Sequence, residues 1–252
     1  MSQSCVTPIH DFNQLKVSCG ACSLTDICLP HGLNPEEQEI LDTLIQHKPS
    51  LKRGESLFHA GDPLKCIYAV RSGSFKTFIN TADGAEQITG FYLPGELIGL
   101  DGLGHDQHRC GSLALESSSV CAMNMDEFEE VCSQIGNLRR QLLRLIGKEI
   151  NQDHESLLAL GQLKGEERLA TFLLSLGKRY QERGFSAAEF NLSMPRHDLA
   201  NYLGLAVETL SRMFSKLQDD GVLSAKRRNI RILDEQRLRK LAHWQCRNIN
   251  SL

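Results

Sequence analysis

The segment from Leu199 to Phe214, LANYLGLAVETLSRMF, constrains the fold most, because small and apolar residues recur in it at fixed spacings. Two helices that cross near a right angle need a small residue at the crossing, which Ala200 supplies, and a residue that accepts positive φ in the turn, which Gly204 supplies. The spacing therefore predicts a helix-turn-helix. Ala206 stands where Ser or Thr is preferred as the cap of the second helix. The residues expected to face the core are Leu203, Leu205, Val207, Leu210, Phe214 and Leu217.

The opposite face of that second helix carries polar side chains that suit base recognition in the major groove. Arg212 can donate two hydrogen bonds to guanine, a pairing worth about 1–3 kcal/mol against the wrong base. Glu208 can accept from a cytosine amino group, and Ser211 can bond several base edges or a phosphate. The alternative is that Glu208 and Arg212, one turn apart, form a solvated ion pair. Ser215 and Lys216 complete this predicted outward face.

The charge distribution also favours nucleic acid at one end of the chain. Residues 161–252 carry a net charge of +6 and residues 1–160 a net charge of −9. A basic end on an acidic body is typical of a protein that binds nucleic acid through that end. A hairpin expected near residues 225–232 could serve as a phosphate-binding wing, although a basic run can equally be a solvated face. Its cations are Lys226, Arg227, Arg228 and Arg231.

Cys19, Cys22 and Cys28 form a C-x2-C-x5-C pattern near the start of the chain. Three thiols so close can converge on one metal centre, and thiolate sets select zinc or iron–sulfur clusters. No signal peptide and no membrane-spanning run is apparent, so the cytosol is the expected compartment and disulfides are not expected. The alternative is that these cysteines are incidental reduced thiols. Candidates for a fourth ligand are Cys5, Cys66, Cys110, Cys121, Cys132 and Cys246.

Residues 31–135 are broken by glycines into short runs of β-type residues, which favours a β-sandwich or roll. Asp83-Gly84 suits a hairpin turn. A helix follows over residues 138–160, with Asn137 as a candidate cap, and its length of about 34 Å suits pairing with a copy of itself. The expected strands are Ile67–Val70, Phe75–Ile79, Gln87–Tyr92 and Ser118–Met123, and the residues on one face of the helix are Ile146, Ile150, Leu157 and Leu160.

Asp153 lies on that same helix face, between Ile150 and Leu157. In a parallel dimer its carboxylate would meet its own copy, and two ionised carboxylates in a drying interface are unfavourable. We therefore expect the helix to pair only marginally, so that a modest input could shift the equilibrium. The alternative is a local rotation of the helix that turns Asp153 to solvent.

These features together resemble the FNR family of oxygen-sensing bacterial transcription regulators, within the cyclic-AMP receptor protein superfamily. The resemblance covers about residues 10–245 and rests on the cysteine pattern and on the segments YAVRSGSFKTF, GAEQITGFYLPGELIG, NLRRQLLRLIGKEI and GLAVETLSRMF. It implies an α+β fold: a cyclic-nucleotide-binding-like β-roll, a long dimerisation helix and a C-terminal winged helix-turn-helix domain. The implied divisions are 1–30 for cluster binding, 31–136 for the roll, 137–161 for the helix and 162–252 for DNA binding.

The resemblance also implies a mechanism. The family holds an oxygen-labile [4Fe–4S] cluster, and its four cysteines match Cys19, Cys22, Cys28 and Cys121. With the cluster intact the protein forms a homodimer, here through Ile146, Ile150, Asp153 and Leu157, and binds palindromic TTGAT-type operators through residues matching Glu208, Ser211 and Arg212. Oxygen converts the cluster to [2Fe–2S] and the dimer loosens. The implied outcome is activation or repression of anaerobic-metabolism genes, with RNA polymerase contacted near Ser72, Thr81–Glu86, Ser117 and Phe185–Ser186.

Three rival interpretations differ in the signal or in the chemistry. A cyclic-nucleotide regulator needs a Glu and an Arg at set places, but Leu100 stands at the first and Arg109 lies two residues out of register, so no cyclic nucleotide is expected. A zinc-stabilised regulator or adaptor would be colourless and indifferent to oxygen. A thiol redox enzyme would need a C-x-x-C that opens a helix after a strand. We find neither that nor a catalytic triad, so no enzyme is predicted. Ser23 and Ile27 flank the cluster cysteines and could tune or shield them.

Overall fold

The computed structural model describes residues 18–48, 50–81 and 83–242. Its first part is a β-roll of two four-stranded antiparallel sheets, with strand orders β1-β8-β3-β6 and β2-β7-β4-β5. The short helix η2 (Cys19–Ala21) and helix α1 (Pro35–Leu44) precede the roll, and η3 (Leu100–Gly102) lies within it. The strands are β1 (Ile45–His47), β2 (Ser56–Phe58), β3 (Cys66–Ser72), β4 (Phe75–Asn80), β5 (Glu86–Tyr92), β6 (Leu97–Ile98), β7 (Gly111–Ala114) and β8 (Ser119–Asn124).

The four predicted strands are confirmed as β3, β4, β5 and β8. Gly84 adopts a φ of +84° in the β4–β5 turn, the conformation for which glycine was expected there. Strand β3 alternates its side chains between two cores. Ile67 and Ala69 face the helices, whereas Tyr68 and Val70 face the space between the sheets. This period of two is the reason that an apolar run can be buried on both faces.

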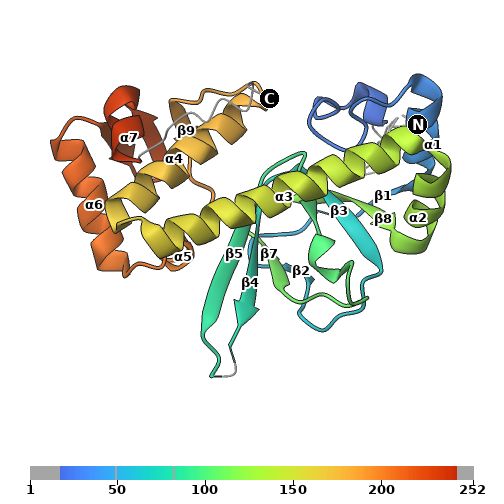
Figure 1. Cartoon of the computed structure of the whole chain (residues 1–252), viewed down its shortest axis with the longest axis horizontal. Helices are drawn as coiled ribbons and strands as arrows, with labels where there is room; N and C mark the ends of the chain where they lie inside the picture. Colours follow the sequence, from blue (N-terminus) through green and yellow to red (C-terminus); the bar gives the residue numbers. More distant parts are fainter. Residues whose placement is uncertain (1–17, 49, 82, 243–252) are drawn as a thin grey trace, which may run out of the picture.

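Helix α2 (Met125–Gln134) leads into helix α3 (Gly136–Gln162), which confirms the long helix predicted for this region. With 27 residues, α3 is about 40 Å long at 1.5 Å per residue, and it runs from the β-roll to the C-terminal part (Figure 1). The predicted cap is wrong, because Ile135 occupies the N-cap and α3 begins at Gly136. Asn137 instead donates from its side chain to the Glu37 carboxylate at 3.0 and 3.1 Å.

The C-terminal part is a winged helix-turn-helix. Its elements are α4 (Gly165–Gln181), β9 (Glu189–Asn191), α5 (Arg196–Tyr202), α6 (Val207–Asp219), β10 (Leu223–Lys226), β11 (Asn229–Ile232) and α7 (Glu235–Leu241). Gly204 takes a φ of +62° in the turn between α5 and α6, and Ala200 is buried at their crossing. One predicted core residue is wrong: Val207 is 39% exposed, because the first residue of α6 projects beyond the packed face.

The two parts of the chain share one hydrophobic core. Ile88, Phe91 and Leu93 of the roll pack with Leu169 and Leu173 of α4 in a single cluster. The winged helix-turn-helix therefore packs on the roll and is also attached to the end of α3 (Figure 1). Among the described residues, no helix is both long enough and apolar enough to cross a membrane.

Candidate functional site

The exposed face of α6 carries the side chains that the sequence predicts to read DNA. Glu208, Ser211 and Arg212 are all exposed, together with Ser215. Within the described residues neither Glu208 nor Arg212 belongs to an ion pair, so both side chains are available to base edges. Ala206 is the N-cap of α6 and provides no side-chain hydrogen bond, as its sequence position indicates. Lys216 differs from its neighbours because its ammonium pairs with Glu166 at 2.7 Å.

The β10–β11 hairpin forms the wing beside α6. Lys226, Arg227 and Arg228 are exposed at its tip, where Arg227 has a φ of +57°. Arg231 lies further along β11, with its Nε 3.9 Å from the Glu189 carboxylate. Exposed cations on a hairpin next to a recognition helix can position the protein on phosphates, while α6 supplies the base contacts.

The four cysteines expected to bind a cluster line one small cavity, of about 30 Å³. Cys19, Cys22 and Cys28 come from the loop that precedes α1. Cys121 comes from β8, where it pairs in register with Ala69 and so takes the side of the sheet that faces this loop. The rest of the cavity wall is mostly apolar and includes Leu24, Leu29, Leu41, Ile45, Val70 and Met123.

The surroundings of Cys19, Cys28 and Cys121 raise the pKa of each of these three thiols and so favour the protonated form when no metal is bound. Burial raises the pKa of Cys28 to about 12 and that of Cys121 to about 11. Burial is also the largest reason that the pKa of Cys19 is raised, and the Asp42 carboxylate adds to it. The loop itself is fixed by the backbone N–H of Cys19, which donates to Asp42 Oδ1 at 2.8 Å. A metal centre here would therefore have to displace thiol protons.

The remaining cysteines in the described residues lie elsewhere. Cys110 donates to Asp101 at 3.2 Å inside the roll, and Cys132 is packed in the core on α2. Cys66 belongs to the core between the two sheets. All seven described cysteines are free thiols. Two further candidates for a fourth ligand, Cys5 and Cys246, lie outside the described residues.

Four thiols around one cavity are a donor set that can hold either zinc or an iron–sulfur cluster. In the part of the chain that the structure describes, no group of three or more His, Cys, Asp or Glu side chains is arranged to hold one metal ion. A structural zinc needs its sulfurs about 2.3 Å from one point. An iron–sulfur cluster distributes its cysteine ligands over several irons. Four thiols around one apolar cavity are compatible with the second arrangement.

Helix α3 presents an uncovered apolar face between the roll and α4. Ile150 is 48% exposed and Leu157 is 66% exposed, while Ile146 is partly buried. Asp153 lies among them, and partial burial raises the pKa of its carboxyl. Leu143 belongs to the same face and was missed, although its spacing of seven residues from Ile150 is a usable signal.

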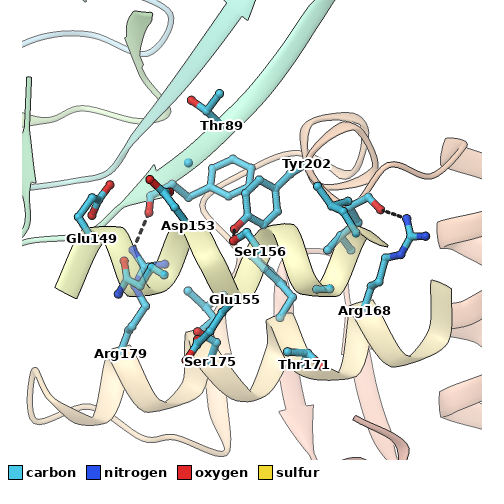
Figure 2. A pocket seen from close by; sticks show the side chains of 18 of the residues that line it. Thr89, Glu149, Asp153, Glu155, Ser156, Arg168, Thr171, Ser175, Arg179 and Tyr202 are labelled. Atoms are coloured by element: carbon cyan, nitrogen blue, oxygen red, sulfur yellow. Dashed lines mark hydrogen bonds between the residues drawn. The ribbon is translucent and has the colours of Figure 1, made fainter. Parts of the chain in front are cut away.

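A crevice of about 90 Å³ separates α3 from α4, and side chains from several elements bridge it (Figure 2). Ser156 of α3 hydrogen-bonds Tyr202 of α5 at 2.9 Å. Arg168 of α4 donates to the Leu203 carbonyl at 2.9 Å. These contacts join the long helix to the helix-turn-helix, and local sequence patterns give no sign of them.

A β-roll of the cyclic-nucleotide-binding type, a long helix and a winged helix-turn-helix with a free recognition face define a class of DNA-binding transcription regulators. Family models agree with both halves: a cyclic nucleotide-binding domain matches residues 48–135, and a Crp-like helix-turn-helix domain matches residues 167–241.

Comparison with individual relatives identifies the family within this class. The transcriptional activator protein anr of Pseudomonas aeruginosa is 45% identical over 90% of this chain and 93% of its own length. The fumarate and nitrate reduction regulatory protein of Escherichia coli K12 is 42% identical over 90% of each chain. The solved structure of FixK2 from Bradyrhizobium japonicum covers 78% of this chain and 96% of its own, with 30% identity and a TM-score of 0.72. The chain belongs to the FNR/Anr family of Crp-type transcription regulators, which are not enzymes.

Proposed function

We propose that this chain is an oxygen-responsive transcription regulator whose DNA binding depends on a [4Fe–4S] cluster held by Cys19, Cys22, Cys28 and Cys121. The observation that carries the proposal is the single cavity lined by all four cysteines, although 93 positions of sequence separate the last two. A cluster held by these four cysteines would supply a centre whose iron and sulfide oxygen can attack. The names of the relatives, a transcriptional activator and a fumarate and nitrate reduction regulator, agree with this role.

The loop that carries Cys19, Cys22 and Cys28, here called the cysteine loop, contacts the first turns of α3. This contact gives the signal a path to the dimer face. Gln141 of α3 donates from its side-chain amide to the Cys28 carbonyl at 3.0 Å. Leu138 of α3 and Leu29 of the loop belong to the same buried cluster. Because packed interiors transmit strain, a rearranged loop would shift the start of α3. The chain then forms a homodimer through Ile146, Ile150, Asp153 and Leu157.

In the dimer, each α6 enters the major groove of one operator half-site. Half-sites read by such dimers lie about 34–36 Å apart along the DNA, and we propose TTGAT-type half-sites read by Glu208, Ser211 and Arg212. Surfaces of the roll and of α4 would then face RNA polymerase in the cytoplasm. Phe185 is 64% exposed in the loop after α4, which suits such a contact. The other proposed contacts are Ser72, Ser117, Ser186 and the turn Thr81–Glu86, of which residue 82 lies outside the described residues.

The charges that line the cavity beside the roll disfavour a cyclic nucleotide. The cavity measures about 420 Å³ and lies between the roll and α3. Three carboxylates line it, from Asp101, Glu149 and Asp153, against the single cation of Arg109. Arg109 is itself exposed rather than buried at the base of the cavity. A cyclic phosphate would lack the buried arginine that pairs with it, so we propose that no cyclic nucleotide controls this protein.

The decisive experiment measures iron, acid-labile sulfide and the visible spectrum of protein purified without air. We expect four irons and four sulfides per chain, and a brown colour that bleaches in air as binding to a palindromic operator is lost. Cys121→Ala should lose iron and DNA binding, whereas the matched control Cys66→Ala, a thiol in the neighbouring core, should keep both. A colourless protein that holds one zinc and binds DNA equally in air would overturn the proposal in favour of a zinc-stabilised regulator.

A further inference from the structure

The turn between β5 and β6, residues 93–96, is held by side chains at the end of α4, the first helix of the DNA-binding part. Glu96 lies at the end of this turn, and its carboxylate is enclosed by Arg179 of α4 and by Arg183 of the turn that directly follows α4. Arg179 Nε donates to Oε1 at 2.9 Å, and Arg183 Nη2 donates to the same oxygen at 2.7 Å. The other oxygen, Oε2, accepts from Arg179 Nη2 at 2.5 Å and from the Leu93 backbone N–H at 2.9 Å. Both carboxylate oxygens are thus fully used.

The same arginines also hold the backbone of the turn. Arg183 Nε donates to the Pro94 carbonyl at 2.7 Å. Arg179 Nη2 reaches the Phe91 carbonyl at 2.5 Å, a contact visible beside Glu149 in Figure 2. Ionised, bidentate hydrogen bonds of this kind are strong and geometrically specific. The position of α4 is therefore tied to the position of residues 91–96.

The cysteine loop supports this turn from its other side. Gly95 has a φ of +89°, and a Cβ added there would lie 2.8 Å from Ile27 Cδ1 and 2.9 Å from Ile27 Cγ1. Only glycine leaves room for Ile27 to rest on the backbone of the turn. Ile27 directly precedes Cys28, which lines the cysteine cavity. A gap of about 30 Å³ beside this contact is bounded by Ile27, Gly95, Glu96 and Arg183, so the loop and the turn that follows α4 both reach residues 93–96.

We propose that the contact between Ile27 and Gly95 couples the cysteine loop directly to the DNA-binding part within one protomer, through the turn 93–96 and Glu96. This route is separate from the pairing of α3 with its copy. It rests on the proposed function in one respect, namely that the loop rearranges when the metal centre changes. While Ile27 supports the turn, Glu96 holds α4, and with it α5 and α6, in the DNA-reading arrangement. Without that support, the contacts of Glu96 with Arg179 and Arg183 loosen, and DNA binding weakens.

The test uses the full-length chain, metal-free and loaded without air, and reads amide hydrogen exchange as well as operator affinity. Ile27→Ala should speed exchange in residues 93–96 and 179–183 of the metal-free protein by ~fivefold or more, and should weaken operator binding of the loaded protein to a similar degree. Dimer content by sedimentation should not change. The matched control is Asp26→Ala, the exposed neighbour of Ile27, which lines neither the cysteine cavity nor the gap beside the turn and should leave both readouts unchanged.

A compensating pair of variants separates coupling from simple destabilisation. Gly95→Ala should loosen residues 179–183, because its Cβ meets Ile27. Adding Ile27→Ala to Gly95→Ala should then restore part of the protection, although Ile27→Ala alone removes protection. Unchanged exchange at 179–183 in Ile27→Ala, or strictly additive effects of the pair, would overturn the coupling. If the protein purified without air holds no iron but its hydrogen exchange still shows the coupling, the proposed function is overturned and the coupling stands.

Discussion

Arg212 occupies a position on α6 where the local environment leaves its guanidinium free. The side chain is exposed and, within the described residues, takes part in no ion pair. A guanidinium in this state can meet both guanine acceptors without first breaking an internal contact. Lys216 on the same face is different, because Glu166 already engages it. On the outward face of α6, an exposed side chain without an internal partner, such as Arg212, can contact bases. A side chain that already has an internal partner, such as Lys216, stabilises the domain instead.

Replacement of Arg212 by Ala should weaken binding to the specific operator by about 1–3 kcal/mol and reduce discrimination at the base it contacts. Titration of the operator and of variants with single base changes would measure this. Lys226→Ala is the control: a phosphate-contacting cation should weaken binding to all sequences alike and reduce the salt slope by about one. If Arg212→Ala lost affinity equally for a scrambled duplex, a base-reading role would be wrong.

Glu149 should make folding stability depend on pH. Burial raises the pKa of its carboxyl, the nearby Asp153 charge adds to this, and a hydrogen bond donated by Tyr92 at 2.6 Å opposes it. An acid whose folded pKa is raised binds its proton more tightly in the folded state, so stability falls as pH rises from the ordinary carboxyl range through the folded pKa. Glu149→Gln should flatten that fall in urea unfolding of the metal-free protein between about pH 5 and about pH 7.5, a range that lies above the pKa of an unperturbed carboxyl.

The control for this pH dependence is Glu155→Gln, an exposed carboxylate on the same helix. It should leave the difference in unfolding free energy between the two pH values as it is in the parent protein. A steeper fall in Glu149→Gln than in the parent would show that the carboxylate is stabilised by the fold, contrary to the burial and charges around it.

Among the elements, α3 contributes to one buried core at its start and leaves an apolar face uncovered further along. Its first turns pack against the cysteine loop, where Leu138 and Gln141 are buried. Further along, Ile150 and Leu157 are uncovered on the face that also carries Asp153. A helix end tied to the cysteine loop and an apolar face left open are the two features that the proposed signal-dependent dimerisation requires of α3. The uncovered face alone would favour association, and the carboxylate opposes it.

Asp153→Ala should therefore raise the dimer content of the metal-free protein. Removing two carboxylates that face each other would favour the dimer by a few kcal/mol at most, enough to shift a marginal equilibrium by about tenfold or more. Sedimentation velocity across a concentration series measures this directly. Asp153→Asn should act in the same direction, and Glu155→Ala, which lies off the face, serves as the control. Unchanged sedimentation of Asp153→Ala would show that Asp153 does not restrain pairing.

At the scale of the whole molecule, the DNA-binding part is docked on the edge of the roll by polar as well as apolar contacts. Lys76 of β4 pairs with Asp198 of α5 at 3.3 Å and with Glu86 at 2.7 Å. The Asn201 side chain of α5 bonds two backbone groups of β5, accepting from the Ile88 N–H at 2.7 Å and donating to the Glu86 carbonyl at 2.6 Å. The orientation of the helix-turn-helix relative to the roll is thereby fixed.

Lys76→Met should destabilise the folded chain by about 3 kcal/mol, because it removes the buried ammonium and leaves the Asp198 carboxylate with only the exposed His197 ring, at 2.9 Å, as a charged or polar side-chain partner. Urea unfolding measures the loss. The control is Lys148→Met, which removes a mostly exposed ion pair between Lys148 and Glu182 and should cost no more than about 1 kcal/mol. Equal, small losses for the two variants would mean that the Lys76 pair contributes no more than a surface pair.

The sequence by itself determined the elements and the residue types of the site, because periodicity, turn glycines and cysteine spacing are local properties. The helix-turn-helix, four strands, the long helix and the outward side chains of α6 were all predictable in this way. Local rules failed where packing overrode them: Asn137 bonds Glu37 instead of capping α3, and Val207 projects into solvent.

Only the tertiary structure decided which distant groups meet. The spacing of the cysteines left six candidates for a fourth ligand, and the register of β8 on β3 places Cys121 against the cysteine loop. The ion pair of Arg179 with Glu96 and the contact of Ile27 with Gly95 join segments that no periodic pattern relates. Such contacts depend on how whole elements pack, because the energy that selects them comes from burial and charge pairing between parts far apart in the chain.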